Sequence, residues 1–272
     1  MLAGIVSVQV GAALSKGAFD EASPTTMVWV RLATAALVLV AVVRPRLAGR
    51  TRGDLAVALA FGGVLALMNW SIYQSFARIP LGLAVAIELL GPLAVALATS
   101  RRRSDVVWVL LAGSGVTLLG LERSGADLAG VLFALVAAAS WAAYILLSAA
   151  TGRAWPGLSG LAVASAVGAV VLGVYAVPAA GGELLDPSVL VVGAVAGLLS
   201  SVVPYSLELV ALRTVPTHVF GTLMSLEPAA GALAGLVLLG ERLGVAEWAA
   251  VACIVVASAG VARHASRVVA PD

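Results

Sequence analysis

The sequence predicts an all-α polytopic membrane protein whose ten transmembrane helices form two inverted five-helix repeats. The 272 residues are 61% hydrophobic and only 11% charged, with a mean hydropathy of +1.08, whereas about a quarter of the residues in a soluble domain are charged. Apolar runs of about twenty residues, long enough to cross a bilayer, follow one another along the chain. One segment also recurs at an offset of 136 residues, which is half of the chain.

Ten apolar runs, five in each half, are expected to be the spanning helices. The first is the least regular, because Met1 already lies inside an apolar run and Lys16 follows early. The sequence therefore predicts that the native first helix begins upstream of Met1. The expected helices are 1–18, 25–43, 54–76, 80–99, 105–121, 127–149, 157–177, 188–212, 215–239 and 244–263.

The recurring segment covers residues 78–98 in the first half and 214–234 in the second. Because each half holds an odd number of helices, the two copies are expected to enter the membrane with opposite orientations. Such inverted repeats are typical of secondary transporters, whose substrate site lies near the middle of the bilayer. The coinciding residues are Pro80/Pro216, Pro92/Pro228, Ala94/Ala230, Ala96/Ala232 and Ala98/Ala234.

Loop charges predict the orientation, because loops rich in arginine and lysine stay in the cytoplasm. Loops that follow even-numbered helices carry eleven arginines: Arg44, Arg46, Arg50, Arg52, Arg101, Arg102, Arg103, Arg153, Arg213, Arg263 and Arg267. The odd-side loops carry only Lys16, Arg78, Arg123 and Arg242, together with Asp20, Glu21, Glu122, Asp127, Glu183, Asp186, Glu241 and Glu247. We expect a bacterial cytoplasmic (inner) membrane protein with both termini in the cytoplasm.

The same charges agree with the inversion. The basic loop at 44–52 corresponds to the acidic segment 181–186, and the basic segment 101–103 corresponds to 238–241. Equivalent loops of opposite charge are what opposite orientations require. The predicted units are residues 1–124, the first repeat, and residues 125–272, the second, inverted repeat.

Several classes of function are not expected. The basic residues are spread over short loops, so no nucleic-acid partner is predicted. Cys253 is the only cysteine, and His218 and His264 are the only histidines. No metal-binding, phosphate-binding or hydrolase motif is present. We therefore expect no cofactor, no metal and no enzymatic activity.

These landmarks resemble the drug/metabolite transporter superfamily, EamA type, and within it the threonine/homoserine exporter branch. The resemblance implies export of small amino acids such as threonine and homoserine by proton antiport, so the implied partners are an amino acid, protons and the lipid bilayer. Whether the protein is a monomer or a homodimer stays open. Residues that carry the resemblance are Arg31, Asn69–Tyr73, Pro80–Ala96, Ser140–Tyr144, Pro204–Glu208, Phe220–Pro228 and Leu239–Glu241.

Ionisable residues within spanning helices are costly and therefore indicate functional sites. Glu88 lies about 12 Å into its helix, counted from the outer surface, and Glu227 lies about 18 Å into the inverted counterpart, counted from the cytoplasmic surface. In a core about 30 Å thick these two depths nearly coincide. Each closely precedes a proline, which kinks a helix and frees a carbonyl. We expect Glu88 and Glu227 to line a central cavity and to bind a substrate ammonium or a proton. The alternative is that both are structural acids, hydrogen-bonded at a kink.

Two other charged positions are ambiguous. Arg31 can pair with a substrate carboxylate, or it can have a structural role by snorkelling outward or by binding Asp20 or Glu21. Glu208 lies near the cytoplasmic end of its helix within reach of Arg213, which suits a gate or a boundary ion pair.

Polar and aromatic side chains complete the expected pocket. Asn69 and Tyr73 share one helix face, as do Trp141 and Tyr144, and Tyr205 is the counterpart of Asn69 at the 136-residue offset. Their alternative role is in packing or in the aromatic belts of the interface. Gln9 and Ser7 are weaker candidates on the first helix.

Two alternatives to amino-acid export stay open. A protein with this fold could export another small metabolite or a toxic cation, or it could be a passive membrane channel.

Overall fold

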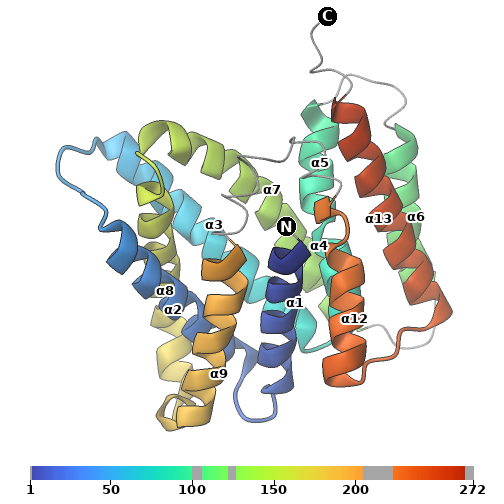
Figure 1. Ribbon diagram of the computed structural model, residues 1–272, viewed down its shortest axis with the longest axis horizontal. Coiled ribbons are helices and arrows are strands. Elements are labelled where there is room, and N and C mark those ends of the chain that lie inside the picture. Colours follow the sequence, from blue (N-terminus) through green and yellow to red (C-terminus); the bar gives the residue numbers. More distant parts are fainter. Residues whose placement is uncertain (1, 100–105, 122–126, 205–222, 267–272) are drawn as a thin grey trace, which may run out of the picture.

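The computed structural model describes residues 2–99, 106–121, 127–204 and 223–266, which are helices joined by short loops (Figure 1). Five helices are long and apolar enough to cross a membrane, and shorter apolar helices accompany them. Each of the ten expected spans includes described helical residues, while residues 205–212 of the eighth span and 215–222 of the ninth lie outside the described ranges. The prediction of an all-α polytopic membrane protein is confirmed. The elements are α1 Leu2–Gly17, α2 Pro24–Val43, α3 Arg52–Phe76, α4 Leu81–Glu88, α5 Leu90–Thr99, α6 Val106–Leu121, α7 Leu128–Ala154, α8 Ser159–Ala180, the 3-10 turn η2 Glu183–Leu185, α9 Pro187–Gly197, the π-helix η3 Leu198–Val202, α12 Glu227–Leu239 and α13 Val245–Ser266.

Short polar side chains start several helices by satisfying backbone N–H groups that have no partner within the helix. Ser23 accepts from the Thr26 N–H at 3.2 Å, and Thr51 forms a capping box with Asp54. Asp127 starts α7 in the same way. Asp186 starts α9, and the hydrogen bond from the Ser188 backbone N–H holds the pKa of its carboxyl below the usual value.

Helices of the first half pack mainly against helices of the second half. Two of them contact their own counterparts at the 136-residue offset: α2 packs on α8 and α6 on α13. In addition, α4 packs on α12, which corresponds to α5. The other main contacts come in pairs that the 136-residue offset exchanges. The contact of α3 with α7 corresponds to that of α9 and η3 with α1, and the contact of α2 with α9 corresponds to that of α8 with α3. This is the pattern expected if the two halves are related by an exchange of equivalent helices.

Backbones approach closely where glycine removes the side chain, as in many membrane bundles. A Cβ on Gly82 of α4 would lie 2.5 Å from the Ala232 Cα of α12. A Cβ on Gly91 of α5 would collide with the Ala138 backbone of α7. These crossings join α4 to α12 and α5 to α7, and α4 also packs on α7.

Candidate functional site

The fourth and ninth spans are both interrupted, and a proline accounts for each break. Pro92 has no N–H to bond to the Glu88 carbonyl, and α4 ends at Glu88 while α5 starts at Leu90. Pro228 likewise leaves the Met224 carbonyl without its helical donor. The helix at 223–224 gives way to a turn at 225–226 before α12 begins at Glu227. The kinks expected from the repeated prolines are confirmed, and one acid lies at each break.

The helix register places the two acids at nearly the same level. The Leu81 N–H, at the start of α4, donates to Glu241 Oε2, just beyond the end of α12, at 2.8 Å, so the helices are antiparallel. Taking the Gly82–Ala232 crossing as the reference, Glu88 lies six residues, or about 9 Å, along α4. Glu227 lies five residues, or about 8 Å, in the same direction along α12. The two acids therefore lie at nearly the same level of the bundle, and their depth in the bilayer stays a prediction.

The two carboxyl groups have different surroundings. Glu227 is 7% exposed and lies in the first turn of α12, where the helix dipole and free N–H groups stabilise an anion. Glu88 is half-buried and is the last residue of α4. The Arg31 guanidinium acts electrostatically on Glu88, although these two described residues form no direct ion pair. One acid thus has a helix N-terminus as its positive neighbour, and the other has an arginine.

Arg31 joins a layer of aromatic and hydroxyl groups. Its guanidinium carbon lies 5.4 Å from the centre of the Tyr73 ring, and its Nε has no hydrogen-bond partner. Tyr73 is completely buried and donates its hydroxyl to Ser15 Oγ at 2.9 Å. The suggestion that Arg31 binds Asp20 or Glu21 is wrong. The side chain folds over Tyr73 instead, because a cation stabilised by an aromatic face does not need a carboxylate partner.

The other polar candidates do not share one surface. Asn69 is buried and donates its side-chain amide to the Leu65 carbonyl at 2.8 Å, within its own helix. Trp141 packs against a small core cluster that includes Ala86 and Leu89. The Tyr144 ring lies 5.0 Å from the Phe61 ring and contacts the main core. Trp141 and Tyr144 therefore contact different neighbours despite their helical spacing. The candidates Tyr205, Glu208 and Arg213 lie outside the described residues.

A clasp of side chain and backbone, not anticipated from the sequence, closes one end of the bundle. Glu241 forms an ion pair with Lys16 at 2.5 Å and also accepts the Leu81 N–H. Lys16 in turn donates to the Ile79 carbonyl at 2.7 Å. These contacts join the end of α1, the start of α4 and the loop after α12. They lie at the end that the loop charges predict to be extracellular.

The Leu239–Glu241 motif was the available signal for this clasp. Gly240 ends α12 in the left-handed conformation, with φ +69°, and the Glu241 N–H returns to the Gly235 carbonyl at 3.0 Å. This glycine-dependent helix end reverses the chain. The Glu241 carboxylate then folds back over Gly235, where a Cβ would collide with it.

The π-helix η3 is a second feature that the sequence analysis missed. In the π pattern the Val203 N–H bonds to the Leu198 carbonyl, and Pro204 cannot supply the next bond, to Leu199. Ser7 of α1 donates its hydroxyl to that Leu199 carbonyl at 2.7 Å instead. Pro204 was the signal for this distortion, and Ser7 has a structural partner here.

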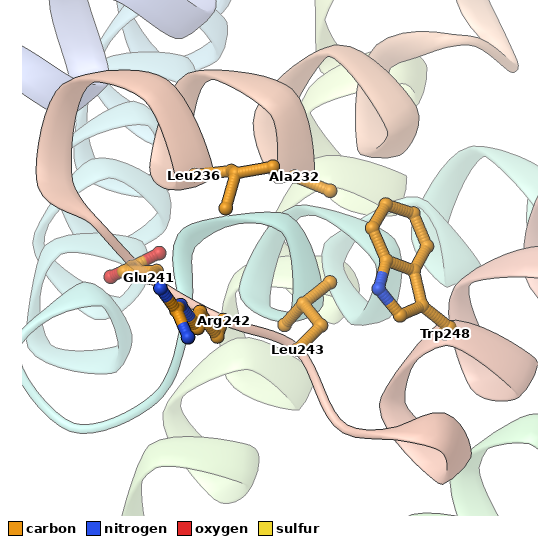
Figure 2. A pocket seen from close by; sticks show the side chains of 6 residues that line it. All are labelled: Ala232, Leu236, Glu241, Arg242, Leu243 and Trp248. Carbon is orange, nitrogen blue, oxygen red and sulfur yellow. The ribbon is translucent and has the colours of Figure 1, made fainter.

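A pocket of about 270 Å³ opens beside the clasp, away from Glu88 and Glu227. Figure 2 shows Glu241 and Arg242 next to each other at the chain reversal after α12, with Trp248 of α13 on the other side. Trp248 is 43% exposed. None of the sequence-predicted site residues lines this pocket; its lining residues are Ala232, Leu236, Glu241, Arg242, Leu243 and Trp248.

The model of the EamA-like transporter family matches residues 128–263. The chain is 40% identical over 263 residues to "Threonine/homoserine exporter RhtA" of Escherichia coli (strain K12) and of Salmonella typhimurium (strain LT2), covering 96% of this chain and 89% of each relative. The chain belongs to the EamA-like transporter family. It is also 32% identical over 153 residues to the "Uncharacterized transporter YwfM" of Bacillus subtilis (strain 168), 56% of this chain and 52% of that one.

A solved crystal structure shares the fold of this EamA-like protein. It aligns with a TM-score of 0.62 and 20% identity, covering 99% of this chain and 98% of that chain. A solute site at the breaks beside Glu88 and Glu227 stays a prediction. Discontinuous helices near mid-membrane provide such sites in secondary transporters.

Proposed function

We propose that this protein exports small amino acids, such as threonine and homoserine, from the bacterial cytoplasm by exchange with protons. The observation that carries the proposal is the pair of acids, Glu88 and Glu227, at the breaks of two equivalent helices. The names of relatives that are 40% identical over nearly the whole chain support the choice of substrate.

The charges match those of a zwitterion. Glu227 attracts the substrate ammonium group, and Arg31 attracts the carboxylate through its guanidinium. Glu88 offsets the charge of Arg31 while the site is empty. When Glu227 binds a proton it loses the negative charge that attracts the ammonium. Proton and substrate therefore exclude one another at one carboxylate, which is the condition for antiport.

Alternating access then requires the two ends of the bundle to open in turn. The clasp of Lys16 and Glu241 joins α1, α4 and the loop after α12 at the predicted extracellular end. In the proposed cycle, substrate enters from the cytoplasm while this clasp holds. Release to the outside requires the clasp to separate.

Transport into everted membrane vesicles from cells that lack their own exporters tests this function. With an acidic lumen, vesicles that contain the protein should accumulate labelled threonine, and a protonophore should abolish the accumulation. Vesicles without the protein are the control. Equilibration without accumulation would indicate a channel, and resistance of cells to lipophilic cations alone would indicate a different substrate class.

A further inference from the structure

Gln9 of α1 is a buried amide that makes no hydrogen bond with the described residues. The side chain is 3% exposed, and its Oε1 has no partner. A buried amide without partners is destabilising, because the hydrogen bonds it made to water are not replaced. Such a group in the middle of a transporter indicates a ligand that supplies the missing bond.

The register of α1 and α12 places this amide beside one of the acids. Lys16 contacts Glu241, and a Cβ on Gly17 would contact the Leu239 side chain, so α1 and α12 run parallel. Further along, Gln9 faces Gly231, where an added Cβ would lie 3.0 Å from Gln9 Oε1. Glu227 is four residues from Gly231, on the same face of α12 and one turn away.

The same point is where α4 joins the two helices. The position that a Gly231 Cβ would occupy also lies 3.4 Å from the Gly82 Cα and 3.5 Å from the Val85 side chain. Glu88 follows Val85 by three residues, one turn further along α4. The Gln9 amide is thus at the junction of α1, α4 and α12, about one helical turn from the level of each acid.

Other unpartnered polar atoms among the described residues fit a ligand less well. Ser200 Oγ lies against Gly11, so closely that a Cβ there would collide with it, and no ligand can enter between them. Arg31 Nε belongs to the group that attracts a carboxylate. Ser71 and Ser75 are completely buried. Gln9 alone in this comparison combines a free acceptor with a position one turn from Glu227.

We propose that Gln9 Oε1 accepts a hydrogen bond from the side-chain hydroxyl of the amino acid whose ammonium group Glu227 holds. This inference rests on the proposed function and adds a basis for selectivity. Threonine and homoserine both carry a hydroxyl, whereas valine has the shape of threonine with a methyl group in its place. A site that bonds to a hydroxyl rejects the analogue without it, because its own polar group then stays buried and unpaired.

The test compares exchange of threonine and valine in vesicles that contain the wild type or Gln9→Leu. The wild type should prefer threonine. Gln9→Leu should lower the threonine-to-valine ratio of kcat/KM by about tenfold, with valine exchange unchanged or faster. Gln9→Met, which has an unbranched side chain of similar length, should behave like Gln9→Leu and guards against a packing defect.

Ser7→Ala is the matched control. Ser7 lies two residues from Gln9, and its hydroxyl bonds to the Leu199 carbonyl, so its loss should affect both substrates equally. Parallel losses of threonine and valine exchange in Gln9→Leu and Gln9→Met would overturn the inference, as would an unchanged ratio. A wild type that exchanges neither threonine nor homoserine would instead refute the proposed function.

Discussion

Glu88 and Glu227 differ in their relation to the prolines that break their helices. Glu88 lies four residues before Pro92, at the carbonyl that the proline leaves without a donor, whereas Glu227 immediately precedes Pro228. At the 136-residue offset Glu88 corresponds to Met224 and Glu227 to Gly91. The backbone breaks are therefore equivalent, but the acids are not, and each can have its own task at the same depth.

Removing the negative charge at each acid separates these tasks. We expect Glu227→Gln to lower threonine exchange at least about tenfold, because a hydrogen bond to a charged group is lost. Whatever exchange remains should no longer depend on pH between 6 and about 8, since the amide cannot bind the proton. Glu88→Gln should chiefly lower KM, because the Arg31 guanidinium then attracts the substrate carboxylate without a competing carboxylate beside it. Initial rates in vesicles over this pH range measure both effects.

The contrasting result is equally clear. If Glu227→Gln and Glu88→Gln both retain wild-type exchange and wild-type pH dependence, the acids are structural, and the proposed site is wrong. Protein abundance in the membrane, measured for each variant, controls for loss through misfolding.

At the scale of elements, proline positions made the breaks in the fourth and ninth spans predictable. Pro92 and Pro228 have a local and nearly deterministic effect, because each removes a specific backbone hydrogen bond. The response to Pro204 was less predictable. A proline can cause a kink or a π turn, and in this structure the Leu199 carbonyl that it leaves free accepts the hydroxyl of Ser7, 192 residues away in sequence.

The candidate site was predictable only in part, for the same reason. Depth along a helix follows from counting residues, so Glu88 and Glu227 were found. Helix rotation and side-chain partners depend on tertiary packing, so the sequence did not place Trp141 and Tyr144 against different neighbours. It also did not show that the Arg31 side chain covers Tyr73. The roles of these residues in binding stay predictions.

The clasp links three elements, and the stabilisation that it provides should depend on Lys16 and Glu241 together. Glu241→Gln keeps an acceptor for the Leu81 N–H but loses the ion pair, whereas Lys16→Met loses the ion pair and the bond to the Ile79 carbonyl. Each should lower the free energy of unfolding by about 2 kcal/mol. The double variant should cost clearly less than the sum, because both remove the same pair.

Thermal unfolding of the purified protein in detergent measures this coupling. Glu247→Gln is a suitable control, because Glu247 accepts only from the nearby Gly244 N–H, at 2.7 Å, on an exposed surface. Strictly additive losses for Lys16→Met and Glu241→Gln would show that the two side chains act independently and that the clasp is not a unit.

For the whole molecule, the packing of equivalent helices and the reversal of loop charge both favour an inverted repeat. Contacts such as α2 with α8 and α6 with α13 join a helix to its counterpart. The loops at the two ends differ in charge, with arginines gathered at one end and acids at the other. An inverted repeat makes both facts expected together, and the loop charges predict that the arginine-rich end faces the cytoplasm.

Labelling of single cysteines tests that orientation. After Cys253→Ala, a cysteine is introduced by Ala48→Cys, in the loop before α3, or by Leu185→Cys, in η2; both positions are exposed. Neither change removes a charge, so the signal that orients the chain is preserved. In intact cells a membrane-impermeant maleimide should label the Leu185→Cys variant and not the Ala48→Cys variant, and in everted vesicles the pattern should reverse. Labelling of Ala48→Cys in intact cells would mean that the arginine-rich end faces outward and that the clasp closes the cytoplasmic side.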